Sequence, residues 1–397
     1  MTDEKQYLTA REAAAELNVG RATLYAYVSR GQIRSEASGN SRSRLYRADD
    51  VRALRARKGP GRDPESIAGD ALNFGLPVLD SSLTLIADGR LYYRGRDAAR
   101  LARAASLETV AGLLWDAGEV DPFADNPPPD VAVPDGLDGM VRCQAMLPWA
   151  AEADARAYNL EAAGVARTGA RILRLLAAGV AGMPAGDAPV HRVLGDAWGV
   201  AAADADLLRA ALVLCADHEL NASTFTVRCV ASTRATPYAA VLAGLAALQG
   251  PRHGGITARV AALFTELETA GNVEAAVADR LSRGDSLPGF GHPLYPAGDI
   301  RAHALLAMLR EADAVEWGDR VLAAVKLMTD GEPTIDVALV LLARTLGLPP
   351  SAPLSIFAVG RCVGWIAHAR EQYRQGNLIR PRARYVGEPP RPAHPER

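Results

Sequence analysis

From about residue 73 onward the chain is rich in Ala and Leu, and its apolar residues recur at helical spacing between Gly and Pro breaks. Four such stretches are LARAASLETVAGLLWDAG (101–118), GARILRLLAAGV (169–180), DLLRAALVLCADHEL (206–220) and DVALVLLARTLGL (336–348). Strand-like alternation is scarce, and the best hairpin candidate is SLTLIADGRLYYRG (82–95), with Asp88-Gly89 as its turn. We therefore predict a mainly α body, in which a large helical domain carries a smaller inserted one.

The length of 397 residues allows two or three domains with a sizeable core. The longest uncharged stretches, around 235–251 and 345–360, contain Pro, Gly and polar residues, so neither predicts a membrane span. The N-terminus is charged from residue 3 and lacks an apolar segment, which argues against a secretory signal. The four cysteines, Cys143, Cys215, Cys229 and Cys362, form no CxxC pair. Scattered cysteines in a chain of this length predict reduced thiols and a cytoplasmic location.

Charge divides the chain into two parts. Residues 1–58 hold 12 Lys and Arg against 7 Asp and Glu, whereas the rest holds 32 against 39. A basic N-terminal part on an acidic body suggests that the two parts meet different partners. GPGRDPES at 59–66 is rich in helix breakers, and we predict a linker over 59–72.

The basic part contains two short helical patterns in YLTAREAAAELNVGRATLYAYVSRGQI (7–33), separated by Asn18-Val19-Gly20. Thr9 and Glu12 form a predicted capping box at the start of the first helix. Gly20 is expected to supply the tight turn between the helices. The predicted buried side chains are Ala13, Ala14 and Leu17 of the first helix and Leu24 and Val28 of the second.

This part, residues 1–58, resembles the winged helix-turn-helix domains of the MerR and excisionase type. The resemblance implies that the second helix enters a groove of double-stranded DNA, and that a β-wing in SGNSRSRLYRADDV (38–51) contacts phosphates. The candidate DNA-binding residues are Arg21, Thr23, Tyr27 and Arg30 of the helix and Arg42 and Arg44 of the wing. The alternative is a helical cap or a dimerisation arm whose arginines are solvated.

Three histidines have unusual local contexts. His218 lies in CADHELNAST (215–224), His253 in LQGPRHGG (248–255), and His292 in GFGHPLYPAGDIRA (289–302). A histidine between Gly and Pro has little core packing to do, and loops often carry chemistry. Each one taken alone also fits a structural or surface histidine.

The ordered motifs are more specific than any one histidine. DHExNxST, GPxHGG, GFGHxxY, PxxD (333–336), GRxVGWxAH and RPRxxY follow one another, and LYYRG stands at 91–95. In this order they closely resemble the citrate synthase family, over about residues 73–387. The resemblance implies a nearly all-α homodimer with its active site between a large domain (73–255 and 346–397) and a small domain (256–345).

The resemblance also implies a chemistry, the condensation of an acyl-CoA with a 2-oxo dicarboxylic acid. Removal of a proton beside a thioester needs a carboxylate base and a group that stabilises the enolate oxygen. Asp336 matches the family's base, His253 the enolate stabiliser, and His292 the acid that polarises the ketone. Arginines suit the carboxylates of the oxo acid because they bind them in a bidentate way. The matching substrate-binding residues are His218, Arg301, Arg361 and Arg380, the last reaching into the partner subunit's site. No metal or tightly bound cofactor is implied, and acyl-CoA enters as substrate.

Structural roles are alternatives for three of these residues. Arg361 could be a buried arginine paired with a carboxylate, Arg380 part of a solvated basic tail, and Asp336 a cap of the helix that follows it. The chain also departs from many family members at Pro293-Leu294, Cys215 and Val337, where Arg-Val, His and an aromatic residue are common. The first departure bears on acyl-CoA affinity, and Val337 bears on the size of the pocket.

We therefore predict a cytoplasmic homodimer that converts acetyl-CoA or propionyl-CoA, oxaloacetate and water to citrate or 2-methylcitrate and CoA. One rival is a related condensation that uses another 2-oxo acid. The rival from a different class is a transcriptional regulator whose body senses CoA esters or oxo acids. The three candidate catalytic residues favour an enzyme, and the basic N-terminal part favours a regulator.

Overall fold

A computed structural model describes residues 7–17, 19, 21–29, 33–37, 44–58, 79–132, 136–312 and 315–388. The chain divides into two compact units, Met1–Asp80 and Ser81–Arg397. Each unit has a hydrophobic core of its own, and the two cores share no residue. The predicted linker at 59–72 lies outside the described residues, and the domain boundaries within the second unit stay predictions.

The first unit is a small α/β module. Its elements are β1 (Tyr7–Thr9), α1 (Ala10–Glu16), α2 (Arg21–Ser29), β2 (Ser35–Ala37), β3 (Arg44–Arg47) and α3 (Ala48–Lys58). The strands form an antiparallel sheet in the order β1-β3-β2, with Leu8 opposite Tyr46. Strand β3 lies within the predicted wing at 38–51, whereas its partner β2 precedes that range.

The capping box at the start of α1 is confirmed. The Thr9 hydroxyl accepts from the Glu12 backbone N–H, and the Glu12 carboxylate accepts from the Thr9 backbone N–H at 2.8 Å. Ala13, Ala14, Leu17 and Leu24 are buried as predicted, together with Leu8, Ile33, Tyr46, Ala48, Val51 and Leu54. Val28 is half-buried against this core. Gly20 lies outside the described residues.

The candidate DNA-binding residues differ in how they are placed. Thr23 on α2 and Arg44 at the start of β3 are exposed. Tyr27, another candidate DNA contact, is half-buried and packs against the core of the module. The exposed aromatic side chain of α2 is instead Tyr25, which is 52% exposed. Arg30, Arg42 and the side chain of Arg21 lie outside the described part.

The second unit is mainly helical, as predicted. Its helices are α5 (Ala98–Ala104), α6 (Leu107–Leu114), α7 (Gly139–Ala153), the short 3-10 helix Ala155–Tyr158, α8 (Ala162–Ala181), α9 (Val190–Trp198), α10 (Ala205–Leu214), α11 (Ala222–Ser232), α12 (Pro237–Leu248), α13 (Ile256–Thr269), α14 (Val273–Ser282), α15 (Ile300–Glu311), α16 (Glu316–Thr329), α17 (Ile335–Thr345) and α18 (Ala352–Gln375). Two of the predicted helical stretches are interrupted. The stretch at 101–118 forms two helices because Ser106 caps a new one, and the stretch at 206–220 is helical only to Leu214.

The predicted hairpin is confirmed. Strands β4 (Thr84–Ala87) and β5 (Arg90–Tyr93) pair antiparallel with Ala87 opposite Arg90, and β6 (Arg96–Asp97) adds a short third strand. Asp88 and Gly89, the two turn residues, both have positive φ, of 51° and 69°. Two positive φ values are what the tight two-residue turn of a hairpin requires, and Asp-Gly tolerates them.

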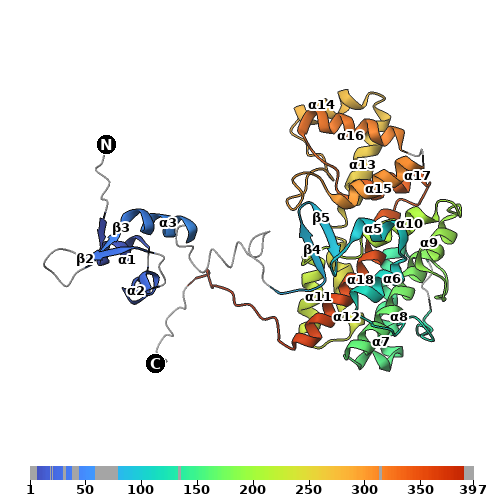
Figure 1. Ribbon diagram of the computed structural model, residues 1–397. Coiled ribbons are helices and arrows are strands. Elements are labelled where there is room, and N and C mark those ends of the chain that lie inside the picture. The colour runs from blue at the N-terminus through green and yellow to red at the C-terminus, as the bar shows by residue number, and fades with distance from the viewer. Residues whose placement is uncertain are drawn as a thin grey trace, which may run out of the picture. The chain divides into compact units, whose positions relative to one another are not determined.

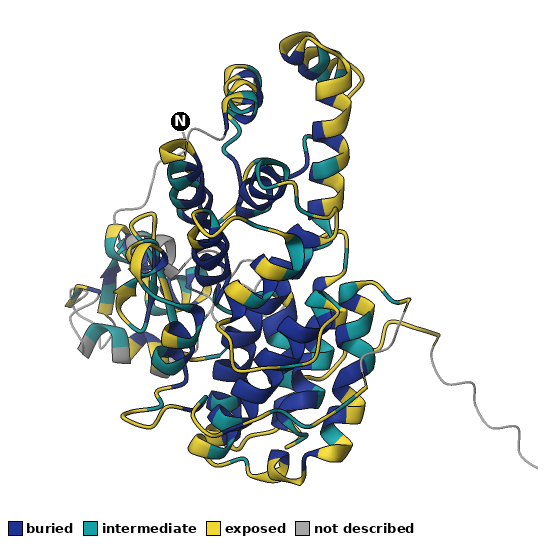
Figure 2. Cartoon of the chain, turned by 90° about the vertical axis from the view of Figure 1, so that its right-hand side faces the viewer, coloured by how far each residue is buried: buried dark blue, intermediate teal, exposed yellow. Residues whose placement is uncertain are grey.

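The helices of the second unit form a larger and a smaller group. Figure 1 shows α13 to α17, in yellow and orange, gathered on one side of the group that holds α5 to α12 and α18. Figure 2 shows the buried residues, in dark blue, concentrated in the inner helices. Helix α18 contacts α6, α8, α10, α11, α12, α13 and α17. It therefore joins the elements on which the candidate site residues lie.

Among the described helices, α18 alone has a length and apolarity that could cross a membrane. Its apolar stretch is 94% buried within the protein. That burial gives the apolar character a structural reason, because α18 packs against other helices on all sides.

Candidate active site

The structure brings six of the seven candidate residues into one region where loops meet helix ends. His218 follows the end of α10, and His253 and His292 lie in loops that precede α13 and α15. Arg301 and Asp336 lie in the first turns of α15 and α17. The sixth, Arg361, lies in the middle of α18.

His218 and His292 face the same tyrosine. Their ring centroids are 5.4 Å apart at nearly right angles, and each ring lies within 5.5 Å of the Tyr295 ring. His218 Nε2 and the Tyr295 hydroxyl are 2.8 Å apart. His292 Nδ1 accepts from the Leu294 backbone N–H at 3.2 Å, so in the neutral ring the proton is carried by Nε2.

His253 is held by a serine. Its Nε2 lies 2.8 Å from Ser223 Oγ, which also accepts from Trp365 Nε1 and lies 2.8 Å from Asn221 Oδ1. A hydroxyl has one proton, so Ser223 can donate either to Asn221 or to His253. This hydroxyl therefore sets which nitrogen of His253 carries the ring proton.

All three histidines are kept neutral by their surroundings. Burial lowers the pKa of His218 well below its usual range, and the nearby Arg301 and Arg361 charges lower it further. Burial, with the same two arginines, lowers the pKa of His253 to about 4. The pKa of His292 is lowered by burial and by Arg301. Neutral imidazoles can donate a hydrogen bond to a developing oxyanion without adding charge to the site.

Asp336 is half-buried, and one of its carboxyl oxygens has a hydrogen-bond partner whereas the other, which is buried, has none. Its Oδ2 accepts from Thr334 Oγ1 at 3.1 Å, whereas the buried Oδ1 has no hydrogen-bond partner. Burial raises the pKa of Asp336 to about 6, although the charge of Arg301 lowers it. A carboxylate with such a pKa and an unoccupied oxygen suits a general base.

Arg301 is locked by a neighbouring carboxylate. Its Nε and Nη2 donate to the two oxygens of Asp299 at 3.0 and 2.8 Å, in a buried bidentate pair. The same carboxylate accepts from the Ile335 backbone N–H at 3.0 Å. Asp299 therefore ties the start of α15 to the start of α17, and with it Arg301 to Asp336.

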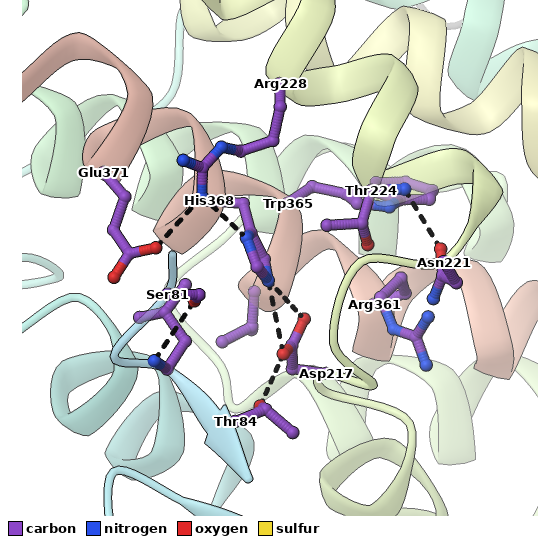
Figure 3. Close-up of polar contacts among 12 residues, drawn as sticks. Ser81, Thr84, Asp217, Asn221, Thr224, Arg228, Arg361, Trp365, His368 and Glu371 are labelled. Carbon is purple, nitrogen blue, oxygen red and sulfur yellow. Dashed lines mark hydrogen bonds and ion pairs between the residues drawn. The ribbon is translucent and has the colours of Figure 1, made fainter. Parts of the chain in front are cut away.

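Arg361 is buried without a carboxylate partner. Its Nε donates to the Cys215 carbonyl at 2.8 Å, and its guanidinium lies over the Phe357 ring at 4.9 Å. Nη1 and Nη2 are buried and have no hydrogen-bond partner (Figure 3). Among the described residues, Arg361 therefore forms no ion pair with a carboxylate, which argues against the alternative of a structural arginine. Two free donors on one buried guanidinium fit the carboxylate of a small anion.

Arg380, the seventh candidate, does not join the others within this chain. It is exposed in the extended segment that follows the end of α18 at Gln375. Its predicted action in the partner subunit's site stays a prediction.

The three departures from the family pattern have different surroundings. Cys215 is fully buried and uses its carbonyl to hold Arg361, and Val337 is fully buried beside Asp336. Pro293 is exposed, next to His292. None of the three replaces a residue of the His253, His292 and Asp336 set.

Sequence reasoning missed the residues that hold the candidates in place. Ser223, Tyr295 and Asp299 each contact a candidate side chain directly. All three lie within the motifs quoted above, so their polar side chains next to the histidines were the available signal. A cavity of about 880 Å³ lined by residues of 106–127 and 174–191 includes none of these side chains.

Comparison with known proteins agrees with the motifs. Residues 73–382 match the family model of the citrate synthase C-terminal domain, and residues 7–59 match that of a helix-turn-helix domain. A citrate synthase of Haloferax volcanii is 32% identical over 363 residues, which cover 79% of this chain and 94% of that protein. Citrate synthase 2 of Bacillus subtilis is 37% identical over 184 residues, which cover 45% of this chain and 50% of that protein. The chain thus spans about half the length of this and several other curated relatives that it matches.

The fold agrees as well. The crystal structure of citrate synthase from Thermotoga maritima superposes with a TM-score of 0.68 and 26% identity, covering 81% of this chain and 96% of that one. The family model covers well over half of the chain, and so does the superposition. The chain therefore belongs to the citrate synthase family, and it carries a helix-turn-helix domain ahead of the family's helical body.

Proposed function

We propose that this protein condenses acetyl-CoA or propionyl-CoA with oxaloacetate and water, and releases citrate or 2-methylcitrate and free CoA in the cytoplasm. The observation that carries the proposal is Asp336, a half-buried residue with a buried, unoccupied carboxyl oxygen and a raised pKa. The charge of Arg301 acts on the pKa of Asp336 and also on the pKa values of His218, His253 and His292, so these groups lie near one another. A base among neutral histidines and arginines fits proton abstraction beside a carbonyl group.

In the first step, Asp336 Oδ1 takes a proton from the carbon beside the thioester. The thioester oxygen then gains negative charge, and His253 stabilises it by donating a hydrogen bond. His253 can donate through Nδ1 when Ser223 donates its proton to Nε2. A rotation of the Ser223 hydroxyl from Asn221 Oδ1, to which it donates at 2.8 Å, to His253 Nε2 gives the tautomer that this step needs.

In the second step, the enolate carbon attacks the ketone carbon of the oxo acid. His292 carries its proton on Nε2, because Nδ1 accepts from the Leu294 backbone, and it polarises and protonates the ketone oxygen. Water then cleaves the thioester, which gives the carboxylate product and CoA.

In this proposal the oxo acid is bound by the two buried arginines of the site, Arg361 and Arg301. Nη1 and Nη2 of Arg361 are free to bind one carboxylate in a bidentate way, and Arg301 adds a second buried positive charge. His218 lies beside these arginines, with its ring held by the Tyr295 hydroxyl at 2.8 Å. A dianionic oxo acid would thus supply the partner that the two terminal nitrogens of Arg361 lack.

The family resemblance extends the proposal to a homodimer, in which Arg380 of each chain completes the partner's site. The exposed, extended segment around Arg380 is compatible with that reach. Hybrids of an Arg380→Ala chain with an Asp336→Asn chain should then recover activity. Purified hybrids that stay as inactive as both parents would exclude this role for Arg380.

The proposal is tested by measuring CoA release from the full chain. A free-thiol assay with a panel of acetyl-, propionyl- and butyryl-CoA against oxaloacetate, pyruvate and 2-oxoglutarate distinguishes the alternatives. We expect the highest kcat/KM with oxaloacetate and one of the two shorter acyl chains. A best rate with another oxo acid would favour the related condensation, and no release with any pair would contradict the proposal.

A second function is favoured by the helix-turn-helix domain match at residues 7–59. We infer that the first unit binds double-stranded DNA, with exposed Thr23 on α2 and exposed Arg44 on the wing strand among its contacts. Its net excess of five positive charges supports phosphate contacts. The body would then act as a sensor of CoA esters or oxo acids, either alone or in addition to catalysis.

A further inference from the structure

Helix α18 contacts each of the three residues that precede His218 in the turn at 215–218. Arg361 Nε donates to the Cys215 carbonyl at 2.8 Å, and the Gly364 N–H donates to the Ala216 carbonyl at 2.9 Å. His368 Nε2 lies 3.4 Å from the Asp217 carboxylate. Residues 361, 364 and 368 lie on one face of the helix, so three successive contacts hold residues 215, 216 and 217.

Asp217 is the charged member of this turn, and it is completely buried. Thr84 Oγ1 from strand β4 donates to its Oδ2, and His368 approaches from α18 (Figure 3). There is no spare room on the helix side, since a Cβ at Gly364 would lie 2.3 Å from Asp217 Oδ1. The carboxylate is therefore confined between the hairpin and α18.

The tautomer of His368 follows from its other neighbour. Arg228 Nη1 lies 3.4 Å from His368 Nδ1, and a guanidinium can only donate. Nδ1 therefore accepts, the ring proton is on Nε2, and Nε2 donates to Asp217. Arg228 is itself fixed by Glu371 at 3.1 Å and by Gln372 at 2.9 Å, both fully within the core.

Glu371, the last residue of this series of contacts, bonds to Ser82 at the start of the segment that forms the hairpin. Glu371 accepts from both the backbone N–H and the hydroxyl of Ser82, at 2.9 and 2.8 Å. Figure 3 shows the resulting series of side chains, from Thr84 through Asp217, His368 and Arg228 to Glu371. Removing one partner of such a buried series leaves a charge or a donor unpaired, which is costly.

We propose that Asp217 and His368 are positioning residues for the oxo acid. They hold the 215–218 turn in register on α18, so that the His218 ring and the free nitrogens of Arg361 converge on the same substrate. The inference deepens the proposed function and rests on it. Burial lowers the pKa of Arg361, and the negative charge of Asp217 partly opposes that lowering, which favours the charged guanidinium.

This role predicts an effect on one substrate only. His218 and Arg361 belong to the turn and helix that the contacts join, whereas Asp336 lies on α17 and His253 in the loop before α13. Loss of the Asp217–His368 contact should therefore weaken binding of oxaloacetate and leave the KM for acyl-CoA nearly unchanged. A merely structural defect would lower the amount of active protein and change neither KM.

The test compares His368→Leu with His368→Gln in the full chain. The leucine variant loses both ring nitrogens, whereas the glutamine amide can still donate to Asp217 and accept from Arg228. Because a hydrogen bond to a charged group contributes about 1.5–3 kcal/mol, we expect roughly a tenfold or greater increase in the KM for oxaloacetate with leucine. With glutamine we expect recovery to within a few-fold of wild type.

Thr84→Val provides a milder variant if the leucine variant does not fold, because it removes only the hydroxyl that donates to Asp217. Its matched control is Thr226→Val, whose hydroxyl bonds to the Ala222 carbonyl within α11. Thr84→Val should raise the KM for oxaloacetate more than Thr226→Val does. Equal changes in the two KM values of a folded variant, or no change in either, would overturn the positioning role.

Oxaloacetate binding measured by calorimetry separates this inference from the proposed function. A wild-type protein that binds oxaloacetate but releases no CoA contradicts the proposed reaction, and the positioning role is then decided by the binding constants of the variants. Unchanged oxaloacetate affinity in His368→Leu and Thr84→Val overturns the positioning role even when the wild type is active.

Discussion

Among the described candidate catalytic and substrate-binding residues, two side chains have buried polar atoms without hydrogen-bond partners, Oδ1 of Asp336 and the terminal nitrogens of Arg361. A buried unsatisfied polar group costs about 1–3 kcal/mol, and more when it is charged. These atoms would therefore destabilise the protein if they had no further role. A substrate with an acidic C–H group and carboxylates would give each of them a partner.

The raised pKa of Asp336 gives a prediction for pH dependence. The base must be ionised, so kcat/KM should rise about tenfold per pH unit below pH 6 and level off above it. His218 and His253 add no second limb in this range, because burial lowers the pKa of His218 well below its usual value and that of His253 to about 4. A pH series of kcat/KM at fixed ionic strength measures this, and a profile that stays flat down to pH 5 would contradict the role of Asp336.

At the scale of elements, α18 is the part on which the site is assembled. It holds the His218 turn, carries Arg361 and contacts both helical groups. The contact is so close at Gly364 that a methyl group would meet Asp217 Oδ1 at 2.3 Å and the Ala216 carbonyl at 2.5 Å. Glycine is needed there for space, whereas in the middle of a helix it otherwise costs stability.

Two glycine substitutions test this packing. Gly364→Ala should destabilise the protein by about 1–3 kcal/mol through overpacking. Gly112→Ala in α6 is the matched control, since its Cβ would meet nothing within 4 Å. It should stabilise the protein by up to about 1 kcal/mol through helix propensity. Calorimetric melting should therefore shift Tm in opposite directions, and a rise in both would show that α18 does not pack closely on the turn.

Features with local causes could be predicted from the sequence. The Asp88-Gly89 turn and the Thr9–Glu12 capping box depend on neighbouring residues, and both are confirmed. Boundaries such as the helix end at Leu214 were placed too late because the apolar pattern continues past it. The contacts of Asp217 with Thr84 and His368 join residues 133 and 151 positions apart, which no local pattern specifies. The candidate site residues came from ordered motifs, and their roles remain proposals.

At the scale of the whole molecule, the chain joins two units with separate hydrophobic cores. The first is basic and matches a helix-turn-helix domain, and the second is acidic and holds all the candidate catalytic residues. Because the cores share no residue, removal of residues 1–65 should not expose the core of the body. The two proposed functions can thus be separated by truncation.

Truncation of residues 1–65 should abolish DNA binding and leave CoA release within about twofold of the full chain. Selection of the full chain from a random DNA pool at near-physiological salt should enrich a two-fold repeat, because a dimer presents two copies of the module. The binding should weaken steeply with added salt. No enriched sequence, together with an unchanged oligomeric state of the truncated chain, would exclude both the DNA-binding and the dimerisation roles.

The central claim is that this protein forms a carbon–carbon bond from an acyl-CoA with Asp336 as the base. The measurement that tests it most directly is CoA release by the wild type and by Asp336→Asn with oxaloacetate and the preferred acyl-CoA, alongside oxaloacetate binding by calorimetry. The asparagine has nearly the same shape but cannot take a proton, so turnover should fall by about a hundredfold or more. Oxaloacetate affinity should change little, because His218, Arg301 and Arg361 are intact. Near-normal CoA release by Asp336→Asn would contradict the account.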